Sequence, residues 1–197
     1  MTSRPRAIGR ADIIAPERYA AERAARKRAL VELKRPRRVA IGPVAMAFFE
    51  SYDTVWMQIH EMLHIERGGE AQIADELRAY AAMVPNGREL VLTLMFEIDD
   101  PERRHALLSG LGGVEHSVSL QFGSETIAAI PEGDIERTNA DGKASSVHFL
   151  HLPFTPAQAT AFRAPGTRVV LGIGHANYGH LAILPEATRA ALADDLD

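Results

Sequence analysis

The sequence predicts an α+β fold: a single domain in which helices pack against an antiparallel or mixed β-sheet. Apolar residues alternate with a period of two in several segments, most clearly over residues 90–98, as is typical of a β-strand. Short turns join the predicted strands, and helices fall between pairs of strands rather than alternating strictly with them, which favours antiparallel pairing. With 197 residues and no clear internal boundary, the chain is expected to form one domain over residues 1–197.

Three helices are predicted in the first half of the chain. Residues 16–34 begin with a proline in the first helical turn, and we expect this helix to pack on the outside of the sheet. Residues 53–66 carry one apolar stripe, with Asp53 as the candidate N-cap. The pair Gly68-Gly69 ends this helix, and a third helix follows up to Pro85-Asn86-Gly87.

The strands are predicted from the same alternation and from the turn residues between them. Gly123-Ser124 is typical of a hairpin turn, and Thr155-Pro156-Ala157-Gln158 matches a helix capping box. Residues 131–144 and 174–180 are expected to form loops. The predicted strands are residues 37–43, 46–50, 90–98, 114–122, 126–130, 146–153, 169–173 and 181–184. Further helices are predicted at residues 101–111, after Thr155 and from Pro185 onward.

Basic residues gather in an N-terminal helical segment at about residues 1–38. Residues 1–40 contain 12 Lys and Arg against 4 Asp and Glu, whereas the remaining chain contains 10 against 22. The plain interpretation is that this segment docks against the acidic remainder of its own chain. A nucleic-acid-binding arm is the alternative, because such arms neutralise phosphates. No aromatic stacking set or nucleic-acid motif accompanies the basic residues, so the sequence does not favour nucleic acid as a partner.

Composition excludes several classes of function. The chain contains no cysteine, so disulfides, thiolate catalysis and iron–sulfur ligation by cysteine are excluded. No apolar run approaches the roughly 18 residues that a membrane span requires, and the N-terminus lacks the apolar stretch of a secretion signal. We therefore expect no membrane partner and a cytoplasmic location. Neither GxGxxG nor GxxxxGK[ST] occurs, which argues against a nucleotide loop.

The motif that most directly suggests chemistry is His60-Glu61-Met62-Leu63-His64, an HExxH pattern on a predicted helix. Side chains at i and i+4 share one helical face, so both imidazoles would bind one Zn²⁺ while Glu61 activates a water. Glu70 follows His64 by six residues, where a metzincin-like pattern places its third ligand. Gly68, however, comes one position later than that pattern requires. The alternative interpretation is that both histidines pack at the edge of the apolar stripe and bind no metal.

Other polar residues offer weaker signals. His148 and His151 are three residues apart on a predicted strand, so they face opposite sides of the sheet and do not share a ligand. His175 and His180 flank a predicted turn, where they would approach one another. Carboxylates within or beside apolar segments need partners if they are buried, and structural ion pairs are expected for them. These carboxylates are Glu50, Glu66 and Glu97, and the candidate partners are Arg67, Arg78 and Arg88.

Several segments resemble an uncharacterised bacterial family, domain of unknown function 3501. They are VAIGP, FFESYDTVWMQIHEML with the following IER, DEL, AY, ELVLTLMFE and SSVHFL, and they run along nearly the whole chain. The residues that match the family's pattern are Glu50, Asp53, Thr54, Gln58, Glu61, Met62, Glu66, Arg67, Glu97 and His148. At His60 and His64 that pattern more usually has Gln and Arg, which weakens the zinc interpretation.

The resemblance implies an accessory role in redox or peroxide defence, beside an iron–sulfur or rubrerythrin-like protein partner. Because the chain lacks cysteine and a nucleotide loop, it would carry electrons poorly by itself. We therefore expect a non-enzymatic accessory or binding protein with no cofactor. A zinc-dependent hydrolase with Glu61 as base and His60, His64 and Glu70 as ligands is the alternative. The sequence leaves the oligomeric state open, a homo-oligomer included.

Overall fold

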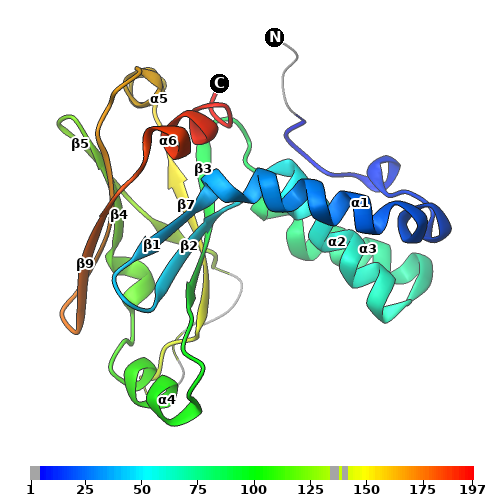
Figure 1. The fold of residues 1–197 in the computed structure, drawn as a ribbon, viewed down its shortest axis with the longest axis horizontal. Helices are drawn as coiled ribbons and strands as arrows, with labels where there is room; N and C mark the ends of the chain where they lie inside the picture. Colours follow the sequence, from blue (N-terminus) through cyan, green and yellow to red (C-terminus); the bar gives the residue numbers. More distant parts are fainter. Residues whose placement is uncertain (1–4, 134–137, 139–141) are drawn as a thin grey trace.

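The structure, a computed structural model, describes residues 5–133, 138 and 142–197 and contains two antiparallel β-sheets (Figure 1). The first sheet has the strand order β1–β2–β3–β7–β6, and the second has the order β5–β4–β8–β9. The first sheet comprises β1 (Arg38–Ile41), β2 (Ala45–Phe49), β3 (Glu89–Phe96), β6 (Ile130–Pro131) and β7 (Val147–Pro153). The second comprises β4 (Val118–Phe122), β5 (Glu125–Ala128), β8 (Val169–His175) and β9 (Tyr178–Ile183).

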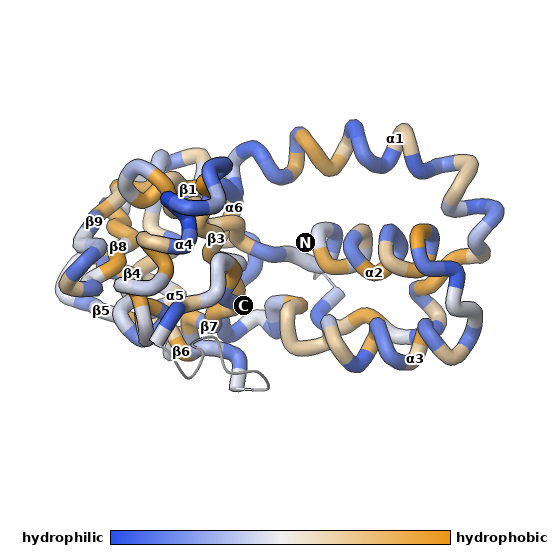
Figure 2. The backbone as a smooth tube through the Cα atoms, turned by 90° about the horizontal axis from the view of Figure 1, so that it is seen from below, coloured by the Kyte–Doolittle hydropathy of each residue, from blue (hydrophilic) through white to orange (hydrophobic). Residues whose placement is uncertain are grey.

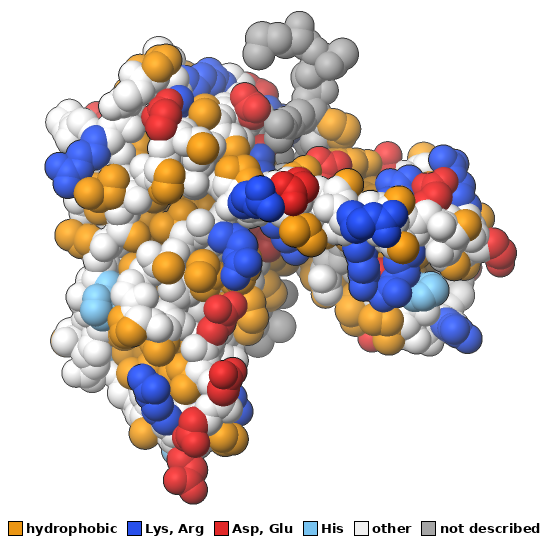
Figure 3. All heavy atoms as spheres, viewed as in Figure 1, with side chains coloured by type: hydrophobic (Ala, Val, Ile, Leu, Met, Phe, Trp, Pro, Cys, Tyr) orange, Lys and Arg blue, Asp and Glu red, His pale blue; other side chains and the backbone are white. Residues whose placement is uncertain are grey.

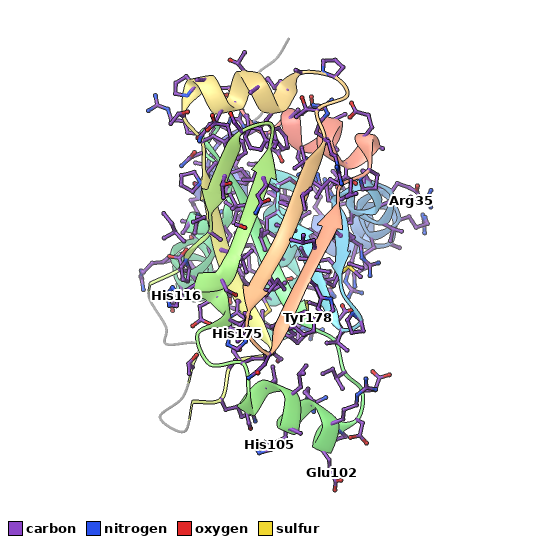
Figure 4. The ribbon with its side chains drawn as sticks, turned by 90° about the vertical axis from the view of Figure 1, so that its left-hand side faces the viewer. Arg35, Glu102, His105, His116, His175 and Tyr178 are labelled. Atoms are coloured by element: carbon purple, nitrogen blue, oxygen red, sulfur yellow. The ribbon has the colours of Figure 1, made fainter. Side chains whose placement is uncertain are left out.

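The two sheets contribute one face each to the larger hydrophobic core. Leu92 and Leu94 of β3 alternate with residues that face the other side, and both are fully buried beside Leu150 of β7. Leu120 and Leu171 of the second sheet belong to the same core. Three short helices lie at the two ends of this sandwich, where Figure 4 shows α4 apart from α5 and α6. They are α4 (Pro101–Ser109), α5 (Pro156–Arg163) and α6 (Glu186–Ala193).

The other three helices project from the sandwich as a separate layer, which we call the helical unit (Figures 1 and 2). It comprises α1 (Pro16–Lys34), α2 (Tyr52–Glu66) and α3 (Gly69–Tyr80), with α2 in the middle. Short 3₁₀ turns connect the elements of the fold at Arg10–Asp12, Arg35–Arg37, Ala81–Met83 and Val114–Ser117. The residues before α1, numbers 8–15, run along the helical unit and are called the N-terminal strap.

A second hydrophobic cluster ties the helical unit to the strap and to the sheet. Trp56 and Ile59 of α2 pack in it with Ile13 of the strap. Val91 of β3 and the partly buried Phe149 of β7 belong to the same cluster, because they face away from the sandwich core. The outer face of the first sheet is therefore covered at the base of the helical unit.

Local sequence explains where α2 begins and ends. The helix is capped by Ser51, not by Asp53 as the sequence suggested: the Thr54 N–H donates to Ser51 Oγ, and the Ser51 N–H donates to Thr54 Oγ1. Hydroxyl side chains serve this role well because they accept from the unpaired N–H groups of the first turn. At the other end Arg67 adopts a left-handed conformation with φ of 56° and stops the helix before the glycine pair.

One tyrosine links the two sheets. The Tyr178 hydroxyl donates to the carbonyl of Ile41 (2.8 Å) and accepts from the N–H groups of Val44 (3.2 Å) and Ala45 (3.1 Å). The β8–β9 hairpin that carries Tyr178 is thereby fixed to the turn between β1 and β2. A hydroxyl has one proton to donate and two lone pairs to accept with, so these three hydrogen bonds use its full hydrogen-bonding capacity.

The predicted fold class, α+β with antiparallel strands and packed helices, is confirmed, but several details differ. Residues 114–117, expected at the start of a strand, form a 3₁₀ turn before β4. There are two sheets rather than one. Helix α1 packs on α2 and not on a sheet. Its Tyr19 is buried in the second hydrophobic cluster, where α2 supplies several of the apolar neighbours. Residues 174–180, expected as a loop, belong mostly to the β8–β9 hairpin, which turns at residues 176–177. Part of the predicted loop 131–144 lies outside the described residues.

The basic N-terminal segment docks on the acidic remainder of the chain, as its composition suggested. Five of its cations form ion pairs there: Arg6 with Asp197, Arg10 with Glu70, Arg23 and Lys27 with Glu61, and Arg37 with Asp195. Three more pair within the segment, namely Arg18 and Arg26 with Glu22 and Arg35 with Glu32. Figure 3 shows basic side chains gathered over the helical unit. Among the described helices, none has the length and apolar character that crossing a membrane demands.

Candidate functional site

A pocket of about 650 Å³ lies at the end of the helical unit farthest from the sandwich. Its walls come from the N-terminal strap, the first turns of α1, the last turns of α2 and the start of α3. The lining residues are Arg10, Ile13, Ile14, Ala15, Pro16, Glu17, Tyr19, Ala20, His60, Leu63, His64, Arg67, Gly69, Glu70 and Ile73. Most of these side chains are apolar or aromatic, and the charged ones are concentrated on the strap, the first turn of α1 and the α2–α3 connection.

His60 is held as a neutral ring within this site. Its Nε2 accepts from the Ile14 N–H (3.2 Å), so its Nδ1 carries the proton and donates to the Trp56 carbonyl (2.8 Å). The ring also stacks on the Trp56 indole, with 3.7 Å between the ring centroids. Burial lowers the pKa of His60, since a charged imidazole would lose its hydration, and the nearby Arg26 adds to this effect. Both ring nitrogens are therefore committed to holding the strap and α2 together.

Glu61 lies outside the pocket lining and contacts α1 instead. It accepts from Arg23 at both oxygens (2.7 and 2.8 Å), from the Tyr19 hydroxyl (2.6 Å) and from Lys27 (2.7 Å). The Arg23 hydrogen bonds, followed by those of Lys27 and Tyr19, lower the pKa of Glu61 to about 2. Burial, together with the hydrogen bond to the same carboxylate, raises the pKa of Tyr19. Glu61 is thus the anchor of α1 on α2.

Glu70 does line the pocket, where an arginine of the strap holds it. Arg10 donates to Glu70 through Nε (2.6 Å) and Nη2 (2.9 Å), so the two planar groups meet as a two-pronged pair. The hydrogen bonds from Arg10 lower the pKa of Glu70. This exposed pair connects the strap to the first turn of α3 across the pocket.

Two lining residues have polar side-chain groups that form no hydrogen bond within the described chain. In the part of the chain that the structure describes, the Arg67 side chain makes no hydrogen bond or ion pair, and neither ring nitrogen of His64 makes a hydrogen bond. The His64 ring packs edge-on against Tyr19, with 5.8 Å between centroids. A pocket with an apolar interior and a free cation is suited to holding an amphipathic small molecule.

The structure brings together three of the four residues that the HExxH motif singled out. His60, His64 and Glu70 line the same pocket, whereas Glu61 points to α1. Within the described residues, no group of three or more histidines, aspartates or glutamates is placed to hold a metal ion. A zinc ligand needs a free lone pair, and the one on His60 Nε2 is taken by the Ile14 N–H. The zinc site stays a prediction, and the hydrogen bond to His60 Nε2 argues against it.

The sequence missed the residues that complete the pocket. Arg10, Tyr19 and Ile73 come from three different elements, so no local motif joins them. The sequence suggested Arg67 as an ion-pair partner and as a match to the family's pattern, but not as a pocket residue. Its left-handed backbone, which is uncommon for a residue other than glycine, is visible only in the structure.

The other histidines are placed as follows. His148 is fully buried in the sandwich, while His151 faces the other side of the sheet, as predicted. His151 lies between Glu89 (3.0 Å to Nδ1) and Glu132 (2.7 Å to Nε2). His175 contacts the Gly112 carbonyl, whereas His180 packs on the Tyr178 ring, and no hydrogen bond or ring contact joins the two within the described residues. Figure 4 shows His175 at the α4 end of the second sheet.

Two of the three carboxylates in or beside apolar segments have partners other than the predicted arginines. Glu50 accepts from the hydroxyl groups of Thr54 and Thr93. Glu66 accepts from the Gln72 amide at 2.8 Å. Glu97 is exposed, so it needs no buried partner. Neutral donors suffice for these groups because none of them is fully buried.

Comparison with known proteins identifies relatives but no activity. A family model described as "Protein of unknown function (DUF3501)" matches residues 7–196. A crystal structure of a novel protein of unknown function from Burkholderia pseudomallei K96243 is similar, with 35% identity and a TM-score of 0.90. The similarity covers 97% of this chain and 100% of that one. No curated protein matches the chain. Because the match spans almost all of its length, the chain belongs to the DUF3501 family of proteins of unknown function.

Proposed function

We propose that this protein is a non-enzymatic binding protein whose pocket in the helical unit holds a small, largely apolar molecule. The observation that carries the proposal is the pocket itself. Its volume of about 650 Å³ falls within the roughly 300–1,000 Å³ of typical ligand sites. Ile13, Leu63 and Ile73 approach it from three different elements, so an apolar ligand would be enclosed from several sides.

The contacts around the HExxH motif support binding rather than hydrolysis. A general base works best when its pKa lies near the operating pH, and the pKa of Glu61 is lowered to about 2. Its oxygens are occupied by Arg23, Lys27 and Tyr19. His60 holds the strap. His60 and Glu61, two of the three motif residues that hydrolysis would use, therefore already have structural partners.

The accessory role implied by the family resemblance is part of the same proposal. A chain without cysteine has no thiolates to hold an iron–sulfur cluster, so the redox group would reside in the partner protein. In this arrangement the pocket senses or delivers a small molecule while an iron–sulfur or rubrerythrin-like protein performs the electron transfer. Co-purification of such a partner with the untagged chain from its own host tests this step, and a chain that elutes alone under gentle conditions contradicts it.

The binding proposal is tested with the chain's single tryptophan. Trp56 stacks on His60, which lines the pocket, so its fluorescence reports events there. Titration with octanol, a neutral apolar probe, is expected to change the emission saturably. Ala20→Phe fills part of the pocket and should abolish the response. Ala29→Phe, on the same helix but outside the lining, is the matched control. An equal response from both variants would contradict binding in the pocket.

The alternative is a zinc-dependent hydrolase, which is favoured by one observation: His60, His64 and Glu70 line one pocket. Zinc binding would require Nε2 of His60 to release the Ile14 N–H and Glu70 to leave Arg10. Elemental analysis of protein purified without a chelator or histidine tag tests it. Stoichiometric zinc that is lost in both His60→Ala and His64→Ala would establish the alternative and displace the proposal of a non-enzymatic protein.

A further inference from the structure

We infer that the ligand of this pocket is an apolar monocarboxylate, with its carboxylate at the α2–α3 connection and its hydrocarbon part inside the pocket. The inference rests on the proposed function and names the chemical class of the ligand.

Arg67 is the first reason. It ends α2 in a left-handed conformation, lines the pocket, and has no intramolecular partner for its guanidinium in the described chain. Its neighbours Gly69 and Glu70 also line the pocket. A planar guanidinium matches a carboxylate through two parallel hydrogen bonds, so a free arginine at the edge of an apolar pocket favours an acidic head group.

The pair of Arg10 and Glu70 is the second reason, because it already demonstrates carboxylate binding at this site. Arg10 holds Glu70 with the two-pronged geometry that it would use for a ligand (2.6 and 2.9 Å). Both side chains are more than half exposed, and exposed ion pairs of this kind contribute little to stability. An incoming carboxylate can therefore take the place of Glu70 on Arg10 at small cost.

The distribution of the other charges fixes the orientation of the ligand. Glu17 is the second acidic residue of the lining, but it belongs to the first turn of α1 and not to the α2–α3 connection. A carboxylate beside Glu17 would be repelled, whereas one beside Arg67 and Arg10 meets two cations and one carboxylate, Glu70, which is already paired with Arg10. His64, with two ring nitrogens free of hydrogen bonds, lies between these regions on the last turns of α2 and is available as a further donor.

The interior of the pocket accounts for the rest of the ligand. Ile14, Leu63 and Ile73 are partly exposed apolar residues of the lining, and the Tyr19 ring is buried behind them. Covering such surfaces with a hydrocarbon chain stabilises the complex in proportion to the apolar area removed from water. A straight or aromatic hydrocarbon would satisfy these walls, which contain few hydrogen-bonding groups.

The test compares octanoate with octanol by Trp56 fluorescence and by calorimetry. The two probes share a hydrocarbon tail and differ in the head group, so their difference isolates the carboxylate. Octanoate is expected to bind about tenfold more tightly, the effect of roughly one charge-assisted hydrogen-bonded contact, and raised salt should weaken only octanoate. Equal affinity for both probes would overturn the inference and leave the binding proposal standing. Binding of neither probe would overturn both.

Three variants locate the head group. Arg67→Gln should weaken octanoate binding about tenfold and leave octanol binding unchanged. Glu70→Gln should strengthen octanoate binding, because it frees the Arg10 fork. Arg78→Gln, which removes an exposed arginine of α3 outside the pocket, is the control and should change neither affinity. If Arg67→Gln lowers both affinities equally, or if Glu70→Gln weakens octanoate binding, the assigned position of the carboxylate is wrong.

Discussion

Arg37 and Asp195 form a buried, two-pronged ion pair between the segment before β1 and the end of the chain. The Nη1–Oδ2 distance is 2.6 Å, the Nη2–Oδ1 distance is 3.0 Å, and each side chain is only 3% exposed. Arg37 also donates to the carbonyls of Glu50 and Ala191. One guanidinium thereby joins the start of the first sheet to the C-terminal helix.

Removing one member of this pair should destabilise the fold strongly. We expect Arg37→Gln to lower the free energy of unfolding by about 3–5 kcal/mol, because Asp195 would remain as a buried charge without its guanidinium partner. Urea denaturation followed by circular dichroism measures the change. Asp75→Asn, which breaks the exposed Arg78–Asp75 pair, is the control and should cost no more than about 1 kcal/mol. Equal effects of both changes would contradict this account.

The second prediction concerns the Tyr178 hydroxyl. Tyr178→Phe keeps the ring but leaves the Ile41 carbonyl and the Val44 and Ala45 N–H groups without this partner. The expected loss is about 1–3 kcal/mol of unfolding free energy, the cost of leaving buried polar groups unsatisfied. Thermal unfolding of Tyr80→Phe provides the comparison, because among the described residues the Tyr80 hydroxyl has one hydrogen bond, an exposed 3.4 Å contact with Gln58. A Tyr178 variant as stable as the Tyr80 variant would show that the link is unimportant.

The contribution of His151 to the stability of the fold should decrease as the pH rises through its raised pKa. The hydrogen bond to Glu89, with that to Glu132, raises the pKa of His151 above its usual 6.5, although burial opposes the rise. A raised folded-state pKa stabilises the fold below pH 6.5, and this contribution is lost as the pH rises through the folded value. The unfolding free energy of the wild type should therefore decrease above about pH 6.5 more than that of His151→Gln. Parallel pH profiles would refute this role.

His60 should have the opposite pH dependence. Burial lowers its pKa below 6.5, so its contribution is complete above that pH and is lost as the pH falls toward the folded value. Protonated Nε2 can no longer accept from the Ile14 N–H, and the strap should loosen. Trp56 emission should then change as the pH falls below 6.5 toward the lowered pKa of His60 in the wild type. His60→Gln should lose this transition; if it keeps the transition, another group is responsible.

The sequence predicted the elements that depend on local patterns. Leu92 and Leu94 alternate in β3 as expected, and the Trp56 stripe of α2 is buried as expected. The sequence did not predict the contacts between segments that lie far apart in the chain. Arg10 and Glu70 are 60 residues apart, so no spacing rule connects them. The HExxH motif placed His60 and His64 on one face correctly, but could not reveal that α1 would supply the partners of Glu61.

The order of strands in the first sheet has a consequence for synthesis of the chain. β3 pairs with β2 on one side and with β7 on the other, and β7 comes only after α4 and the whole β4–β5 hairpin. While the ribosome is still making those segments, one edge of the apolar strand β3 has no neighbour, and such edges pair readily with other chains. Nascent chains truncated before residue 147 should accordingly aggregate or recruit chaperones more than chains that extend through β7.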